Sequence, residues 1–258
     1  MGTGQTIEAL LDGSIFQFMM IFARLGSAVA LLPGFGEAYV AVRIRLAFAL
    51  LFSLVLLPML ADRVPVLPAQ LDRFVIDLVG EIGIGLFFGT LCRIILLTVL
   101  SAGNIIALQT GIANALSVDP SSAQQAAVSG NFLMAVTLVL IFSTGLDHVT
   151  LQALIGTYAV MPPGQLPLLG DMANFDSRVV ADSFALALQM SAPFLVYGLV
   201  FAAALGVLAR LMPALQIFFV ATPAQLLGGL GLLAVTLSSL MLWFLDSYQR
   251  QLAPFLDH

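Results

Sequence analysis

The stretch AGNIIALQTGIANALSVDPSSAQQ, residues 102–125, follows directly on an apolar block at residues 78–100 and turns polar while staying almost free of charge. Gly103 and Gly111 lower helix propensity, and the pair Asp119–Pro120 disfavours helical backbone before the proline. We therefore expect the end of a helix that leads into a loop. Non-helical backbone survives at membrane depth only where protein buries it or where it lines an aqueous cavity. This stretch is therefore the first candidate for a functional surface.

The composition around this stretch is that of a membrane protein. Of the 258 residues, 60% are hydrophobic and 9% charged, and the mean hydropathy is +1.07, whereas soluble domains carry about 25% charged residues. The nine basic residues are all arginines, scattered from Arg24 to Arg250 without a run, which argues against a nucleic-acid partner. Cys92 is the sole cysteine, which excludes an internal disulfide and disfavours a thiolate metal site.

Long apolar blocks predict helices, and no alternating pattern suggests a barrel. We expect helices within residues 14–32, 46–57, 78–100, 131–146, 149–160, 183–209 and 214–245. A polar connection with a short amphipathic turn near its end is expected at residues 61–77, and a polar loop or an amphipathic approach to the next helix at residues 168–182. A break is expected at Pro193. The last two blocks predict a C-terminal helical hairpin, so the expected fold class is an all-α integral membrane protein.

Four ionisable residues lie inside or at the edge of these apolar blocks: Arg24, Glu81, Arg93 and Arg210. A charge at the centre of a membrane helix costs about 2.5–3.5 kcal/mol, so each should face a partner, water or another subunit. The alternatives are that Arg93 and Arg210 snorkel to the interface and that Glu81 lies at the membrane edge. Glu81 and Arg93 are about 18 Å apart along a helix and do not pair. Glu81 therefore needs Arg24, Arg210 or a neighbouring chain as its counterion.

Glycines crowd two of the apolar blocks. Gly85 and Gly89 have the small-x-x-x-small spacing that allows helices to approach closely, and Gly228 and Gly229 form a similar pair. Packing within the chain and packing between chains are both open.

His148 beside Asp147 is the only candidate pair for acid–base chemistry. No nucleophile motif, phosphate loop or metal spacing accompanies the pair, so we expect neither an enzyme nor a cofactor, and a helix-end or interfacial role for His148.

A series of short motifs, in this order and spacing, resembles the FliR family, the R subunit of the flagellar type III export gate. The resemblance covers roughly residues 14–248 and no single motif decides it. The motifs are Phe18-x-x-x-Phe22-x-Arg24-Leu25-Gly26, Leu32-Pro33-Gly34-Phe35-Gly36, Val42-Arg43-Ile44-Arg45, Glu81-Ile82-Gly83-Ile84-Gly85, Gln109-Thr110-Gly111, Asp119-Pro120, Gly145-Leu146-Asp147-His148 and Arg210-Leu211-Met212-Pro213.

The resemblance implies a bacterial inner-membrane protein of the flagellar basal body. In that family one R subunit joins several P and Q subunits, contacts other export-apparatus membrane proteins and lipid, and passes unfolded protein substrates. Residues 1–170 would be a P-like region with a plug loop near 103–125, and residues 171–258 a Q-like hairpin. The helices would pack in a raised assembly, so that other subunits cover apolar faces in place of lipid.

The resemblance also implies a loop that plugs the closed channel. Carried over by position, the plug comprises Gln109, Gly111, Ile112, Ala113, Asn114, Leu116, Asp119 and Pro120. The family loop is often aromatic, whereas Ile112 and Leu116 are smaller. The alternative function is a small-solute secondary transporter, with Arg24, Glu81 and Arg210 as an intramembrane site and a broken helix at residues 103–111 as its gate.

Overall fold

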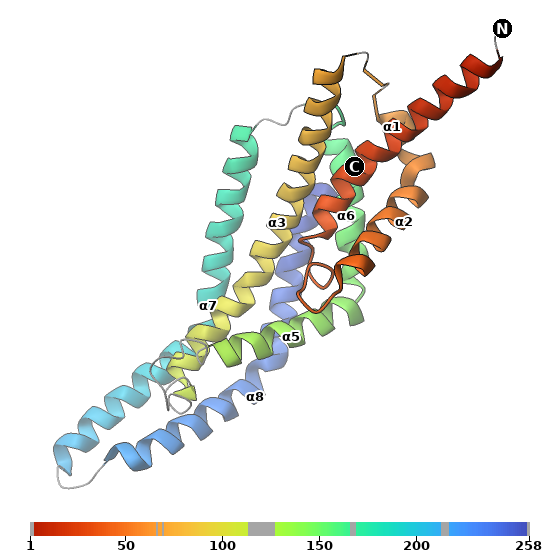
Figure 1. Ribbon diagram of the computed structural model, residues 1–258. Coiled ribbons are helices and arrows are strands. Elements are labelled where there is room, and N and C mark those ends of the chain that lie inside the picture. Colours follow the sequence, from red (N-terminus) through yellow and green to blue (C-terminus); the bar gives the residue numbers. More distant parts are fainter. Residues whose placement is uncertain are drawn as a thin grey trace. The chain divides into compact units, whose positions relative to one another are not determined.

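Every regular element that the structure describes is helical (Figure 1). A computed structural model describes residues 3–65, 67, 68, 70–112, 127–165, 169–212 and 217–256. Its elements are α1 (Thr3–Val29), α2 (Val42–Leu60), the 3-10 turn η1 (Ala61–Arg63), α3 (Leu71–Gln109), α5 (Ala127–Ser143), α6 (Leu146–Val160), α7 (Leu169–Leu211), α8 (Ile217–Leu252) and the 3-10 turn η2 (Ala253–Phe255).

The expected all-α membrane fold is confirmed. Within the described residues, four helices are long and apolar enough to cross a membrane, namely α2 with its following turn, α3, α7 and α8. The count rises to five if the pair α5 and α6 is taken as one broken span. Gly145 separates that pair and adopts a left-handed φ of 76°, a conformation that suits glycine because it has no Cβ.

The end of α3 lies later than the sequence predicts. We expected loop character from residue 102, but α3 continues without interruption from Leu71 to Gln109. Gly103 does not break the helix, because it serves a close contact with α5. A Cβ at Gly103 would lie 2.5 Å from the Cα of Gly130. The polar connection expected over residues 61–77 also ends early, since α3 begins at Leu71.

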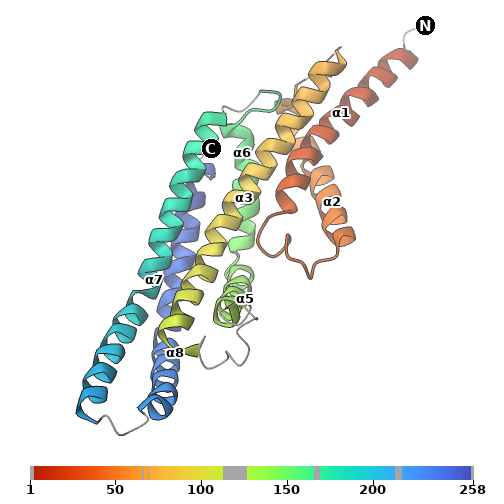
Figure 2. The ribbon, with the colours of Figure 1, turned by 60° about the vertical axis from the view of Figure 1, so that its left-hand side comes forward.

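Of the two structures expected for residues 168–182, the polar loop is wrong, since α7 begins at Leu169. Asp171 lies in its first turn, where a carboxylate interacts favourably with the helix dipole. Pro193 does not end α7 and Pro223 does not end α8. Each proline removes one backbone hydrogen bond, which a helix tolerates when neighbouring helices support it. The two helices lie side by side as a hairpin, in agreement with the prediction (Figure 2).

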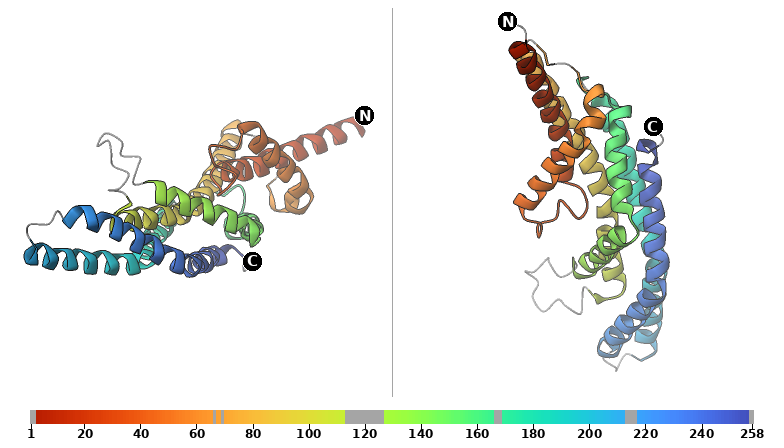
Figure 3. Two further views of the ribbon diagram at one scale, coloured as in Figure 1. Left: turned by 90° about the horizontal axis from the view of Figure 1, so that it is seen from below. Right: turned by 90° about the vertical axis from the view of Figure 1, so that its right-hand side faces the viewer.

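The chain divides into two compact units. The first unit comprises Met1–Ile94, Gly145–Val179 and Gln251–His258, and the second comprises Ile95–Thr144 and Val180–Arg250. In the first unit α1 packs against α2 (Figure 3). This division does not follow the boundary between residues 1–170 and 171–258. That boundary concerns resemblance to other subunits, and it stays a prediction.

Candidate functional site

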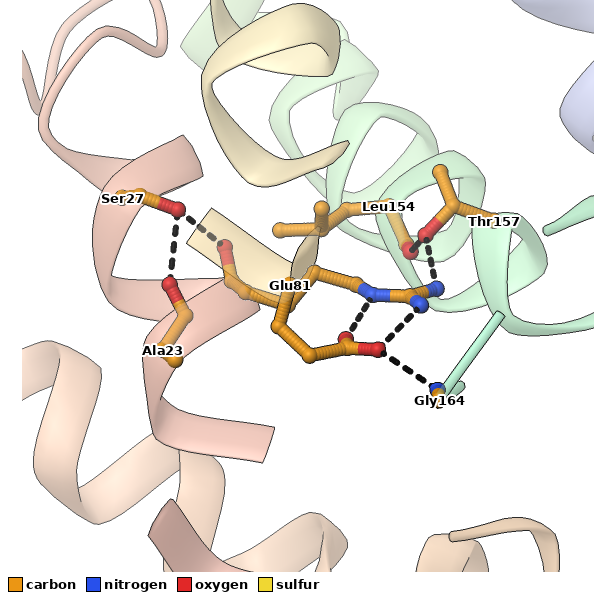
Figure 4. A network of polar contacts seen from close by, with 7 residues as sticks. Ala23, Ser27, Glu81, Leu154, Thr157 and Gly164 are labelled. Carbon is orange, nitrogen blue, oxygen red and sulfur yellow. Dashed lines mark hydrogen bonds and ion pairs between the residues drawn. The ribbon is translucent and has the colours of Figure 1, made fainter. Parts of the chain in front are cut away.

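A buried ion pair joins α1 to α3 in the first unit (Figure 4). The guanidinium of Arg24 donates from Nε to Glu81 Oε2 at 2.6 Å and from Nη2 to Glu81 Oε1 at 3.1 Å. The side chain of Arg24 is 0% exposed and that of Glu81 is 1% exposed. The planar guanidinium fork matches the carboxylate in a bidentate geometry, which is the strong form of such a pair. Arg24 is therefore the counterion that Glu81 needs.

Two further segments of the first unit contact this pair. From α6, Thr157 Oγ1 accepts from Arg24 Nη1 at 3.4 Å, and the ring of Tyr158 lies under the guanidinium, 4.1 Å from its carbon. From the turn after α6, the Gly164 amide donates to Glu81 Oε1 at 3.3 Å. Arg73 of α3 donates to the Gly164 carbonyl at 3.0 Å. The pair thus connects α1, α3, α6 and the following turn.

The predicted glycine pair on α3 packs within the chain, against α1. A Cβ on Gly85 would collide with Ser27 Oγ and the Arg24 carbonyl, and a Cβ on Gly89 would lie 2.8 Å from the Cβ of Leu31. The two glycines therefore allow the backbones to approach closely beside the ion pair.

The other two predicted intramembrane charges do not join this pair. Arg93 bonds Glu37 in the loop after α1 through Nη1 at 2.9 Å, so it has a charged partner within the chain. Arg210 lies in the last turn of α7 and is exposed. A cation at that position interacts favourably with the C-terminal end of the helix dipole.

The root of the predicted plug loop lies in the second unit, at the end of α3. Gln109 is the last residue of α3, and Gly111 follows with a left-handed φ of 76°. Ile112 is half-buried. The rest of the predicted plug lies outside the described residues, namely Ala113, Asn114, Leu116, Asp119 and Pro120.

The second predicted glycine pair supports this root. A Cβ on Gly228 would lie 2.6 Å from the Tyr197 hydroxyl, and a Cβ on Gly229 would lie 2.5 Å from the Cβ of Thr110. This pair also serves packing within the chain.

The pair His148–Asp147 is a local contact at the start of α6. His148 Nδ1 lies 3.0 Å from Asp147 Oδ1, and the imidazole is 79% exposed. Among the residues described, no group of three or more His, Cys, Asp or Glu side chains could hold a metal ion.

The structure bears on the two features on which the transporter alternative depended. Arg24 and Glu81 satisfy each other and are closed to solvent, whereas Arg210 is exposed and belongs to the other compact unit. The helix expected to break over residues 103–111 is continuous to Gln109.

Sequence reasoning missed the polar side chains that hold these sites in place. Thr157 and Tyr158 carry no pattern that connects them to Arg24, and the main-chain amide of Gly164 carries none that connects it to Glu81. Gln225, whose amide donates to the Gln109 carbonyl at the loop root, did carry a signal, because an amide in the apolar run 214–245 is expected to bond a neighbouring helix.

The fold and these sites define an all-α membrane protein held by buried polar contacts, with a loop root braced by a helical hairpin. The chain belongs to the family described as bacterial export proteins, family 1, which matches residues 15–251. It is 36% identical to the flagellar biosynthetic protein FliR of Caulobacter vibrioides over 93% of this chain and 96% of that protein. The proteins of the same name from Escherichia coli and Bacillus subtilis are 29% and 26% identical, over 91% and 86% of this chain and 85% and 86% of theirs.

This membership confirms the resemblance to the FliR family. Together with the apolar helices, it identifies the chain as an inner-membrane component of the flagellar export apparatus in the basal body. Other membrane proteins of that apparatus are its partners.

Proposed function

We propose that this chain is a non-enzymatic subunit of the flagellar export gate, in which it forms part of the channel wall and seals the closed pore with the loop after α3. P and Q subunits surround it, one copy of the chain serves each gate, and unfolded flagellar proteins are the substrates. The membership in the export family and the exposed apolar surface of the hairpin support this proposal.

The length of the hairpin is the observation that carries the proposal. Residues 217–245 of α8 contain no charged residue and correspond to about 44 Å of helix. The hydrocarbon core is about 30 Å thick, and a tilt of 40° accommodates only about 39 Å. In the most apolar 18-residue stretches of α7 and α8, only 11% and 22% of the residues are buried within the chain. Part of this apolar surface therefore needs a cover of protein, which neighbouring helical subunits supply.

The sealing step is steric. In the closed gate, the apolar side chains after Gly111 fill the pore, and the loop yields when a substrate enters. Gly111 gives the loop a flexible start, since its left-handed backbone is open to glycine at little cost. Ile112 and Leu116 fill less volume than aromatic side chains, so several side chains of the loop form the seal together.

Cross-linking to a stalled substrate tests the plug. Cysteines are placed at Ile112 and Asn114 in a Cys92→Ala background, with a cysteine at the 81% exposed Val235 of α8 as the control. We expect the substrate to cross-link at Ile112 and Asn114 and not at Val235. Absence of cross-links at both loop positions, while other gate subunits cross-link to the same substrate, would exclude the loop from the path.

Deletion of residues 111–115 tests the seal. We expect the closed gate to leak ions or small solutes, measured as dissipation of an ion gradient in cells that hold no export substrate. The control is Gly206→Ala, at a site with open space around the added Cβ, which should not leak. An unchanged leak in the first variant, with the complex intact, would refute the sealing role.

A further inference from the structure

A polar cluster in the second unit lies where α3 ends and the proposed plug loop begins. Gln225 of α8 donates from Nε2 to the main-chain carbonyl of Gln109 at 2.9 Å. The last four carbonyls of a helix have no partner within that helix and need one from outside. A side chain of the hairpin therefore caps α3 at the residue from which the loop departs.

Gln225 is itself held by the other helix of the hairpin. The Tyr197 hydroxyl of α7 donates to the main-chain carbonyl of Gln225 at 2.6 Å. The absence of a side chain at Gly228 gives this hydroxyl its space, because a Cβ there would lie 2.6 Å from it. Gly198 of α7 likewise leaves space for the Gln109 side chain, because a Cβ on Gly198 would collide with Gln109 Oε1.

The first residues beyond α3 lie against the same side chain. A Cβ on Gly111 would lie 3.2 Å from both Cδ and Oε1 of Gln225. Thr110 is fully buried and packs on Gly229 of α8. Gln225 thus contacts the loop root at two points, the carbonyl before the loop and the glycine that starts it.

We propose that Gln225 is a positioning residue that holds the root of the plug loop against α8 in the closed gate, and that Tyr197 fixes Gln225 for this task. Because the Gln225 bond runs from the hairpin to the loop root and the Tyr197 bond joins the two helices of the hairpin, a displacement of α8 along α7 breaks both bonds and frees the loop. This inference rests on the proposed sealing function of the loop, and it assigns the control of that seal to the hairpin.

Gln225→Met tests the inference, because methionine keeps the length of the side chain and removes the donor. Loss of one neutral hydrogen bond corresponds to about a fivefold change in an opening equilibrium. We expect amide hydrogen exchange at Gly111 and Ile112, measured on the purified complex, to rise about fivefold, and the closed gate to leak. Gln225→Glu also lacks the donor and places a carboxylate beside the Gln109 carbonyl, so its effect should be larger.

Gln17→Met is the matched control. Gln17 Nε2 also donates to a main-chain carbonyl, that of Ala61, at 3.1 Å, but this bond lies in the first unit. Gln17→Met should therefore change neither the hydrogen exchange at Gly111 nor the leak of the closed gate. Tyr197→Phe removes the hydroxyl that fixes Gln225 but keeps the amide donor of Gln225, so it should raise the exchange by less than Gln225→Met. It serves as the test variant if the complex with Gln225→Met fails to assemble.

The outcomes separate this inference from the proposed function. Raised exchange and leak in Gln225→Met, with normal recovery of the complex, support the positioning role. Unchanged exchange at the root overturns it. Raised exchange without a leak, while deletion of residues 111–115 does leak, also overturns it and leaves the seal standing. If the deletion does not leak, the sealing function is refuted, and the exchange alone decides whether Gln225 holds the root.

Discussion

The buried pair Arg24–Glu81 makes the sharpest prediction about stability. The Glu81 carboxylate accepts three hydrogen bonds, two from Arg24 and one from the Gly164 amide at 3.3 Å. In Arg24→Met only the last of these remains, around a carboxylate that is 1% exposed. Removal of one partner of a buried pair costs about 3–5 kcal/mol, because the other charge is left uncompensated. We place Arg24→Met at the upper end of this range.

The reciprocal variant Glu81→Met should cost less. Arg24 then keeps its bond to Thr157 at 3.4 Å and its position over the Tyr158 ring. A desolvated cation–π contact contributes up to about 2 kcal/mol, so the loss should be near 3 kcal/mol.

The double variant Arg24→Met/Glu81→Met should be the most stable of the three. It buries two apolar side chains and leaves no charge, and such replacements are often neutral. It still loses the partner of the Gly164 amide, which costs about 1 kcal/mol. The single variants lose about 5 and 3 kcal/mol and the double variant about 1 kcal/mol, so the coupling energy of the double-mutant cycle should be about 7 kcal/mol.

Thermal unfolding of the complex in mild detergent measures these effects. About 3–5 kcal/mol corresponds to a fall in Tm of roughly 10 °C for a chain of this size. Arg250→Met is the control, because Arg250 pairs with Asp246 on the exposed face of α8, with both side chains more than half exposed. Such pairs contribute about 0–1 kcal/mol. Single variants at the buried pair that behave like Arg250→Met, or a double variant that loses the sum of the singles, would refute the reasoning.

Three further variants test single sites. Gly85→Ala should lower Tm by about 5 °C or more, because the new methyl collides with α1. The control Gly83→Ala has open space around its Cβ and should raise Tm slightly. Equal changes of Tm in the two variants would exclude the close contact between α3 and α1. Gly111→Ala should destabilise the loop root by about 1–2 kcal/mol, since its φ is 76°, and raise hydrogen exchange there, while Gly206→Ala should not. His148→Ala should leave the export rate unchanged in a secretion assay, and a loss above tenfold would point to a role in proton transfer.

The sequence predicted the class of fold and its charged positions better than the partners of those positions. Hydropathy located the helices, and the cost of an isolated charge in hydrocarbon required a counterion for Glu81. The sequence could not distinguish Arg24 from Arg210 as this counterion, because both arginines lie in or beside apolar blocks. Only the tertiary fold brings Arg24 to Glu81 on α3.

Helix ends were the weaker part of the prediction, for a physical reason that Gly103 illustrates. Glycine lowers helix propensity by about 1 kcal/mol relative to alanine, so a glycine followed by polar residues suggests an end. At Gly103 the close contact with Gly130 on α5 outweighs that preference. The start of α7 was missed for the complementary reason, since acidic side chains at an exposed helix start stabilise the helix and also resemble a loop.

Two polar contacts of this chain involve groups whose burial costs free energy unless they are paired. Arg24 and Glu81 connect α1, α3 and the turn at Gly164. Hydrogen bonds between the two charged groups need donor–acceptor distances of about 3 Å, so the pair limits how far α1 and α3 can slide past each other. The hydrogen bond of Gln225 to the Gln109 carbonyl restricts the position of the loop root in the same way, but more weakly. A neutral hydrogen bond from Gln225 holds the Gln109 carbonyl, and such a bond contributes about 1 kcal/mol, less than the cost of removing one partner from a buried ion pair. If the proposed function is correct, the weaker contact therefore lies at the part of the chain that has to open.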